Sequence, residues 1–177
     1  YLGQFDKQLE YSLQAMELIE KRDKKEKLSA MYHNIANAYY NLQQFRKAVD
    51  YCILSLKLHQ QTGSNEYPNR VYASLGQSYA MLKNTDSALF YYNTGIDESI
   101  KLNDKYAAAA IYGYMANTYA DRNEFKKMLE VSERSLKLSE ELQSNQMLAS
   151  SFYNIAYANY FNGDNMAARQ HINKALE

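Results

Sequence analysis

Apolar and small residues recur along the chain with the spacing of an α-helix that has one buried face. Between residues 32 and 58 they form two such runs, separated by a polar break at residues 41–44. The break leaves room only for a tight turn, so we expect the two helices to pack against each other as a hairpin. A single hairpin cannot cover its own apolar faces, so further helices have to pack on it.

The same pattern returns every forty residues, without insertion or deletion, and we call positions forty residues apart a column. One aromatic column consists of Tyr32, Tyr72, Tyr112 and Phe152. A small column consists of Ala36, Gly76, Ala116 and Ala156. A fixed period of this length is typical of a stacked helical array, in which each unit buries its faces against its neighbours.

These columns resemble the tetratricopeptide repeat, and the first full copy matches it at Tyr32, Ile35, Ala36, Tyr39, Phe45, Ala48 and Ser55. The resemblance covers essentially the whole chain. Its forty-residue spacing exceeds the family's usual period of about 34 and is similar to a variant found in bacterial regulatory and sensor proteins. The resemblance implies an all-α, right-handed superhelical solenoid of stacked antiparallel helix hairpins.

The register predicts a single solenoid over residues 1–177, with a half repeat at 1–25 and full repeats at 26–65, 66–105, 106–145 and 146–177. The half repeat supplies one helix near 5–22. First helices are expected near 27–42, 68–82, 106–121 and 146–161, and second helices near 45–61, 85–102, 125–142 and 165–177. Residues 2–5 fall at the turn inside a repeat, so we expect the chain to be a fragment of a longer protein.

Turn residues also recur in phase. Gly3, Asn123 and Gly163 share a column that suits a left-handed residue closing the first helix. Asn84 and Asp164 follow as expected N-caps of the second helix. Between repeats, a helix stop followed by a cap is expected at Gly63-Ser64, Asn103-Asp104 and Gln143-Ser144. Pro68 fits the first turn of its helix, which should therefore start later than its counterparts.

The first helix has no preceding partner in this sequence, so we expect its apolar stripe to be partly exposed. The stripe includes Leu9, Leu13 and Met16. An apolar face of this kind tends to find a second copy of itself, and self-association through this helix is therefore expected.

Composition narrows the function classes. Twenty basic and twenty acidic residues cancel, so no overall charge favours nucleic acid or an anionic membrane. A single cysteine excludes an intrachain disulfide and a multi-cysteine metal site, and Cys52 lies on a core stripe as an inert thiol. No apolar run reaches the roughly 20 residues of a membrane span. The compartment stays open between cytoplasm and periplasm.

No pattern of catalytic residues is present, and we expect neither an enzyme nor a cofactor or metal. His33, His59 and His171 form no metal-binding pair, and no glycine-rich phosphate loop or nucleophile motif occurs. Most of the eighteen tyrosines belong to the scaffold. Six of them fill the two aromatic columns of the first helices: Tyr32, Tyr39, Tyr72, Tyr79, Tyr112 and Tyr119.

The resemblance implies that the first helices line a concave groove, with side chains one, five, eight and nine residues after the first aromatic column. Repeat by repeat these are His33, Asn37, Tyr40 and Asn41; Ala73, Gln77, Ala80 and Met81; Gly113, Asn117, Ala120 and Asp121; and Tyr153, Tyr157, Tyr160 and Phe161. The expected groove is lined by amides along its length and is aromatic at its C-terminal end.

Carboxamides donate and accept hydrogen bonds, which suits a bound peptide backbone, and grouped aromatics suit an apolar anchor side chain. Two plainer readings stay open. Asn could be simply frequent in that column, and the aromatics could cover a missing neighbouring helix. The cationic clamp with which some family members hold a C-terminal carboxylate is not matched, because His33, Gln77 and Gly113 stand at those positions.

The leading hypothesis is a non-catalytic scaffold whose groove binds an extended or helical peptide from a protein partner. The alternative is the sensor or regulatory region of a larger bacterial signalling protein, a histidine kinase or a transcriptional regulator, whose output domain lies outside this fragment.

Overall fold

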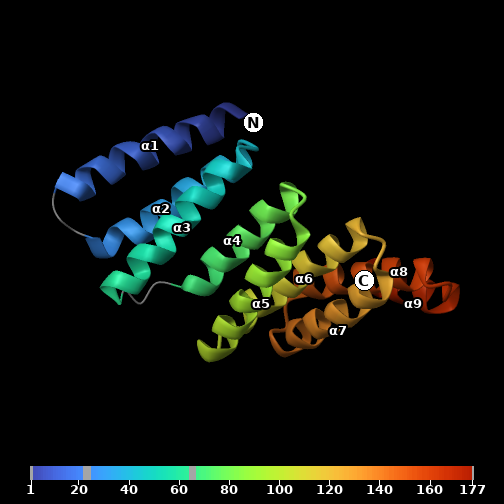
Figure 1. Cartoon of the computed structure of the whole chain (residues 1–177). Coiled ribbons are helices and arrows are strands. Elements are labelled where there is room, and N and C mark those ends of the chain that lie inside the picture. The colour runs from blue at the N-terminus through green and yellow to red at the C-terminus, as the bar shows by residue number, and fades with distance from the viewer. Residues whose placement is uncertain (1, 22–24, 64–66, 177) are drawn as a thin grey trace. The chain divides into compact units, whose positions relative to one another are not determined.

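The computed structural model describes residues 2–21, 25–63 and 67–176, and in these ranges the chain forms nine α-helices and no strand (Figure 1). They are α1 (Leu2–Lys21), α2 (Lys25–Asn41), α3 (Phe45–Thr62), α4 (Pro68–Met81), α5 (Thr85–Lys101), α6 (Lys105–Asp121), α7 (Phe125–Glu141), α8 (Asn145–Phe161) and α9 (Asn165–Leu176). Apart from the start of α1, every boundary lies within two residues of its expected position.

The helices belong to two compact units, residues 1–95 and 96–177, with the boundary inside α5. In the N-terminal unit, α2 packs against α1, α3 and α4, and α3 packs against α4. In the C-terminal unit, α8 packs against α6, α7 and α9, and α6 packs against α7. The all-α architecture of stacked helix hairpins is confirmed, while the single array of one half repeat and four full repeats stays a prediction.

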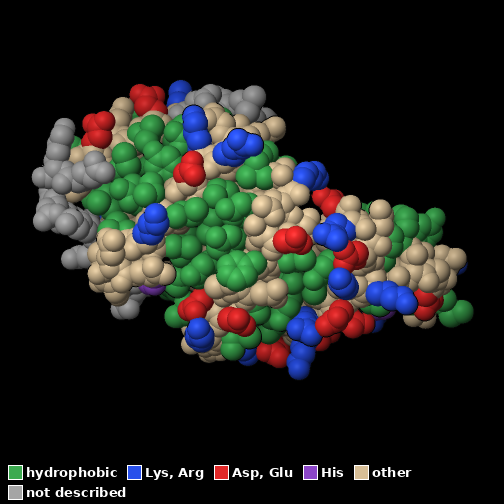
Figure 2. Space-filling model, viewed as in Figure 1, with side chains coloured by type: hydrophobic (Ala, Val, Ile, Leu, Met, Phe, Trp, Pro, Cys, Tyr) green, Lys and Arg blue, Asp and Glu red, His purple; other side chains and the backbone are tan. Residues whose placement is uncertain are grey.

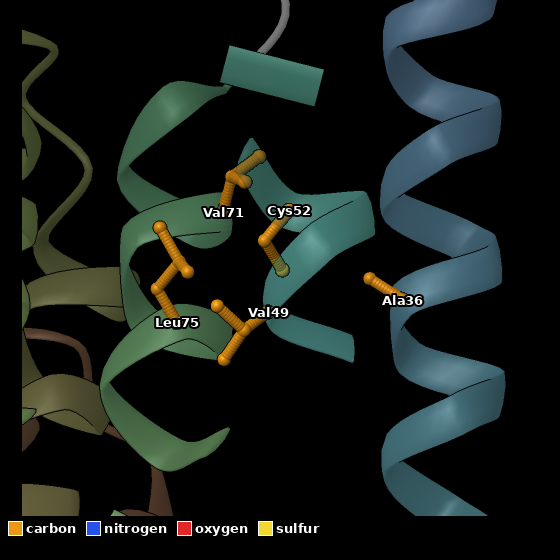
Figure 3. Packing of buried hydrophobic residues seen from close by; sticks show 5 residues of the cluster. All are labelled: Ala36, Val49, Cys52, Val71 and Leu75. Carbon is orange, nitrogen blue, oxygen red and sulfur yellow. The ribbon is translucent and has the colours of Figure 1, made fainter. Parts of the chain in front are cut away.

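The core of the N-terminal unit shows how one hairpin is covered by the next helix. Val49 and Cys52 on α3 lie between Ala36 of α2 and the pair Val71 and Leu75 of α4 (Figure 3). All five side chains are buried, and Cys52 has no exposed surface. Burial raises the pKa of the Cys52 thiol to about 12, which keeps it protonated and unreactive as expected.

Paired columns compensate each other in size. The column of Cys52 continues as Tyr92, Ser132 and Ile172. Tyr92 is its bulkiest member, and it lies against Gly76, where a Cβ atom would run into its ring. The small column therefore holds glycine where the facing column holds tyrosine, because the two helices could not otherwise approach.

The tyrosine columns are part of the scaffold, as expected. Tyr51 of α3 lies 5.4 Å from Tyr39 and 6.1 Å from Tyr32 between ring centroids. Tyr91, one repeat later, contacts Tyr79 and Tyr72 in the same way. In the C-terminal unit this column holds Val131 and His171, and cations cover the two tyrosines of α6 instead. Arg134 lies over Tyr112 and Lys127 over Tyr119.

The turns confirm one expected column and correct part of it. Asn123 (φ 58°) and Gly163 (φ 89°) are left-handed, as expected. Gln43 and Lys83 in the same column are left-handed too, although neither residue type suggested it. The assignment of a turn to residues 2–5 was wrong, since Gly3 lies inside α1. A turn between two helices needs a helix on each side, and only α1 is present at this point.

The caps follow the sequence with one exception. The side chains of Asn84, Asp104 and Asp164 accept backbone N–H groups three residues later, at 2.9–3.2 Å. Ser144 occupies the N-cap position of α8, as expected, but its side chain makes no capping hydrogen bond. Its backbone is extended, and α8 begins without side-chain help. Pro68 occupies the first turn of the shortened α4, as expected, and Ser64 lies outside the described residues.

The surface can be compared with the expectations for an exposed first helix and for a balanced charge. Leu9, Leu13 and Met16 on α1 are only half-buried, as expected, while self-association through this face stays a prediction. Positive and negative side chains lie side by side over α7 in Figure 2. None of the helices in the described ranges combines the length and apolar character that a bilayer crossing requires.

Candidate functional site

In the N-terminal unit, the expected groove residues of α2 are tied to α4 by side-chain hydrogen bonds. The Ser74 hydroxyl donates to Oδ1 of Asn37 at 3.1 Å and lies 2.9 Å from Nε2 of His33. The Asn37 amide lies 3.4 Å from the same ring nitrogen. These three side chains form a compact polar network that links α2 to α4. Some of the polar groups that were expected to bind a ligand therefore form hydrogen bonds within the protein.

His33 is held in its neutral form by this environment. Burial, and after it the charge of Arg70, lowers the pKa of His33 to about 4. Because the single Ser74 proton is donated to Asn37, the 2.9 Å contact requires an Nε2–H that donates to the Ser74 oxygen, which the neutral imidazole provides. The network is therefore built around the neutral histidine.

The other groove residues predicted for this unit lie on α2 and α4. Tyr40 is half-buried, with its ring edge-on to Phe45 at 5.4 Å. Asn41 and Met81 are exposed at the ends of their helices, and Gln77 is half-buried. These residues remain candidates for ligand contact.

The C-terminal unit is hollowed where the predicted groove residues of α6 and α8 face each other. A pocket of about 680 Å³, here called the α6–α8 pocket, is lined by Gly113 and Asn117 on α6 and by Tyr153 on α8. No side chain approaches Gly113 within 4 Å of where a Cβ atom would lie. The wall contains no charged residue and includes the carboxamides of Asn117, Gln146 and Asn154. Asp121 is exposed at the end of α6 and does not line this pocket.

The predicted aromatic residues of α8 form one connected cluster. Tyr157 lies 6.3 Å from Tyr153 and 4.8 Å from Phe161 between ring centroids. Tyr160 meets Phe161 edge-on at 5.2 Å, and Phe161 stacks on Phe125 of α7 at 4.5 Å. We call Tyr153, Tyr157, Tyr160, Phe161 and Phe125 the aromatic cluster.

The cluster faces outward. Tyr153, Tyr157, Tyr160 and Phe161 expose 53, 38, 61 and 49% of their surface, so α9 does not bury them. The same four residues line a second pocket of about 600 Å³, here called the α8–α9 pocket, with Arg169 and Ile172 of α9 on its other side. Tyr153 and Ile172 line both pockets and form the wall that they share.

Sequence reasoning missed one column of the site. Asn34, Ser74, Tyr114 and Asn154 are forty residues apart, and three of them take part in the contacts described above. Ser74 completes the His33 network, and Tyr114 and Asn154 line the α6–α8 pocket. The sequence did contain a sign of this role, because the column holds a polar or amphipathic residue in every repeat.

A second missed residue is Arg169. Its column is otherwise apolar, with Val49, Leu89 and Leu129 at the earlier positions. A charge in that column was a readable sign that this face of α9 is not buried. Arg169 is indeed exposed and lines the α8–α9 pocket.

The described residues contain no group of three or more His, Cys, Asp or Glu side chains arranged to hold a metal ion. The site as it stands offers apolar surface, aromatic faces and neutral hydrogen-bonding groups. Such a surface can bind a ligand.

Comparison with known proteins agrees with the helical hairpins. Residues 27–97 match the family model of the tetratricopeptide repeat. No protein of curated function matches the chain in sequence. BtubC from P. vanneervenii has a similar structure, with a TM-score of 0.78 and 15% identity, over 99% of this chain and 88% of that chain.

Two further structures are similar. A putative kinesin light chain of Podospora anserina with TPR-like repeats gives a TM-score of 0.77 at 18% identity, over 98% of this chain and 86% of that chain. The MamA protein gives a TM-score of 0.68 at 18% identity, over 98% of this chain and 82% of that chain. At these identities the likeness concerns the fold alone.

Proposed function

We propose that the chain, of which residues 27–97 match the tetratricopeptide repeat model, is a non-catalytic scaffold that binds a peptide segment of a protein partner on its C-terminal unit. The fold is that of a protein-interaction scaffold, in a family that is generally non-catalytic. The α6–α8 pocket and the aromatic cluster form the proposed binding surface. The peptide is extended or helical.

One observation carries this proposal: four neighbouring aromatic side chains of α8 remain exposed beside a pocket. Clustered exposed aromatics are costly in water and are typical of interaction sites. Aromatic residues grouped around a pocket also make the usual anchor for a bulky apolar side chain of a partner. A peptide residue entering the α8–α9 pocket would contact Tyr157 and Phe161.

The α6–α8 pocket suits the neighbouring part of the same peptide. Its wall is uncharged, so a charged side chain would lose hydration there without gaining a partner. The carboxamides of Asn117, Gln146 and Asn154 can pair with both N–H and C=O groups of a peptide backbone. Asn37 and Gln77 on the N-terminal unit lie outside this proposed surface, and Asn37 is already bonded to Ser74.

The rival explanation is that the aromatic cluster is covered by another helix and contributes only to stability. The two explanations predict different effects of truncating Tyr157. As a ligand anchor, Tyr157 contributes to binding, whereas as a covered core residue it contributes to the melting temperature.

The test is Tyr157→Ala, measured with a peptide selected from an array of short peptides of varied sequence. We expect the variant to lose about 2 kcal/mol of binding free energy, close to 30-fold in Kd, as an anchor residue would. The matched control is Tyr11→Ala, which removes a tyrosine that is 66% exposed on α1. A lower melting temperature with unchanged peptide binding would refute the proposal.

The two asparagines extend the test. Asn117→Ala should weaken binding of the same peptide by about 1 kcal/mol, the net value of a hydrogen bond, and leave the melting temperature unchanged. Asn37→Ala should leave binding of this peptide unchanged and lower stability by about 1 kcal/mol, since its partners Ser74 and His33 stay behind. Thermal melts and titrations on the same samples separate the two effects. The role of a signalling sensor stays a prediction.

A further inference from the structure

A third pocket lies away from the proposed peptide surface, between the end of α5, the start of α6 and α7. This α6–α7 pocket encloses about 330 Å³ and shares no lining residue with the other two pockets. Ile100, Ala108, Leu138 and the ring of Tyr112 provide its apolar lining. The pocket is at the lower end of the size range of ligand sites in proteins.

The charges around this pocket are unbalanced. Three cations line it, Lys105, Arg134 and Lys137, against a single acid, Glu141. The whole chain, by contrast, has a net charge of zero. The local surplus therefore stands out against a neutral protein, and it favours an anionic ligand.

The acids present do not fully satisfy these cations. Lys105 lies 2.8 Å from Glu141, and Arg134 lies 2.7 Å from Glu130, with side chains that are 39–62% exposed. Lys105, and to a smaller extent Lys137, lowers the pKa of Glu141, so one carboxylate faces two lysines. Exposed pairs of this kind are weak and exchange readily with other anions.

Arg134 has a packing role, because its guanidinium lies over the ring of Tyr112. Helix stability, however, does not account for Lys105 and Glu141. Lys105 is the first residue of α6 and Glu141 the last of α7, and both charges oppose the helix dipole. In the two preceding repeats, the column of Arg134 holds Leu54 and Thr94. The column of Lys137 holds Lys57 and Asp97. The repeat therefore folds without this set of cations.

We propose that the α6–α7 pocket binds an acidic peptide segment in which an aliphatic side chain lies beside carboxylate groups. The aliphatic side chain occupies the apolar lining formed by Ile100 and Leu138. The carboxylates pair with Lys105, Lys137 and Arg134 at the rim, and one of them takes the place of Glu141 beside Lys105. Site and ligand then match in both polarity and charge.

The probe is an acetylated, amidated pentapeptide with leucine at its centre and glutamate at the other four positions, labelled for fluorescence anisotropy. We expect Lys137→Gln to weaken its binding about two- to fivefold, the range for one exposed charge pair. The matched control is Lys57→Gln, which removes a lysine from the same column without touching the pocket, and it should change nothing.

Two further variants have effects that a purely structural role would not produce. Glu141→Gln removes the competing carboxylate and should strengthen binding by a similar factor, the opposite sign to Lys137→Gln. Ile100→Ser changes a side chain that is 66% exposed, so the fold should tolerate it. This variant should weaken binding of the leucine probe but leave binding of a probe with glycine at its centre unchanged.

Equal affinities for wild type, Lys137→Gln and Glu141→Gln would overturn the proposal. So would a probe with glutamine in place of glutamate that binds as tightly as the acidic probe. Octanoate offers the same chemistry as a free amphiphilic carboxylate. If it displaces the probe at comparable concentration, the pocket recognises a small amphiphilic anion and the peptide assignment is wrong.

Discussion

The N-terminal and C-terminal units use the same repeat columns for different purposes. In the first, the groove columns hold His33 and Asn37, whose polar atoms bond to Ser74 on the next first helix. In the second, they hold Gly113 and Asn117 opposite Tyr153, and the space between them is an open pocket. The repeat period therefore specifies how the helices pack. The side chains in the groove columns decide whether their polar groups bond within the protein or stay available to a ligand.

The largest expected effect concerns the column of Cys52, whose member Tyr92 is tightly packed in the N-terminal unit and whose member Ile172 borders a pocket in the C-terminal unit. Tyr92 is 1% exposed and packed on Gly76, whereas Ile172 is half-buried beside the α8–α9 pocket. Tyr92→Ala should cost about 3–5 kcal/mol of stability, because it leaves a large cavity. Ile172→Ala should cost nearer 1 kcal/mol, since its site is already open. Urea denaturation followed by circular dichroism measures both, and equal losses would abolish the contrast.

The next effect is specific to the His33 network. The pKa of His33 falls from about 6.5 in an unfolded chain to about 4 in the fold. A lowered histidine pKa contributes stability that is complete above pH 6.5 and is lost as the pH falls toward 4. The loss should amount to about 2–3 kcal/mol over that window.

The control for this prediction is His33→Gln, which keeps a side chain able to hydrogen-bond to Ser74 but does not titrate. Its stability should fall less than that of wild type between pH 7 and pH 4. Parallel denaturation curves for the two proteins across this range would show that His33 is not a buried neutral base.

The smallest effect compares two helical glycines from different columns: Gly76 faces the packed ring of Tyr92, and Gly113 lines the open α6–α8 pocket. Gly76→Ala should destabilise the protein by about 1 kcal/mol, because the buried ring of Tyr92 has to move and this outweighs the better helix propensity of alanine. Gly113→Ala meets nothing within 4 Å and should stabilise by about 1 kcal/mol. Melting temperatures that move in the same direction would contradict this account.

The fold could be predicted from the sequence because the period is unbroken. Columns such as Ala36, Gly76, Ala116 and Ala156 fixed the helices to within two residues, apart from the start of α1. The left-handed turns at Gln43 and Lys83 could not be read from residue type, since the hairpin geometry imposes them against local preference. Local sequence also could not show that Ser144 fails to cap α8.

The site was less predictable than the fold. The expected groove residues lie on the helices anticipated for them, and their ligand contacts stay a prediction. Whether Asn37 is free or bonded depends on Ser74, which is thirty-seven residues away and lies outside the expected groove columns. The exposure of Tyr157 and Phe161 depends on how α9 packs. Such properties arise from contacts between helices, which the period alone does not encode.

The most direct test of the central claim is to map the array-selected peptide on the isotope-labelled protein by NMR. The account predicts the largest amide shifts along α6 and α8, around Gly113, Asn117, Tyr153 and Tyr157. Amides around His33 and Asn37 should move little, because their side chains are already bonded to Ser74. Large shifts on α2 and α4, with α8 unaffected, would contradict the assignment of the ligand surface to the C-terminal unit.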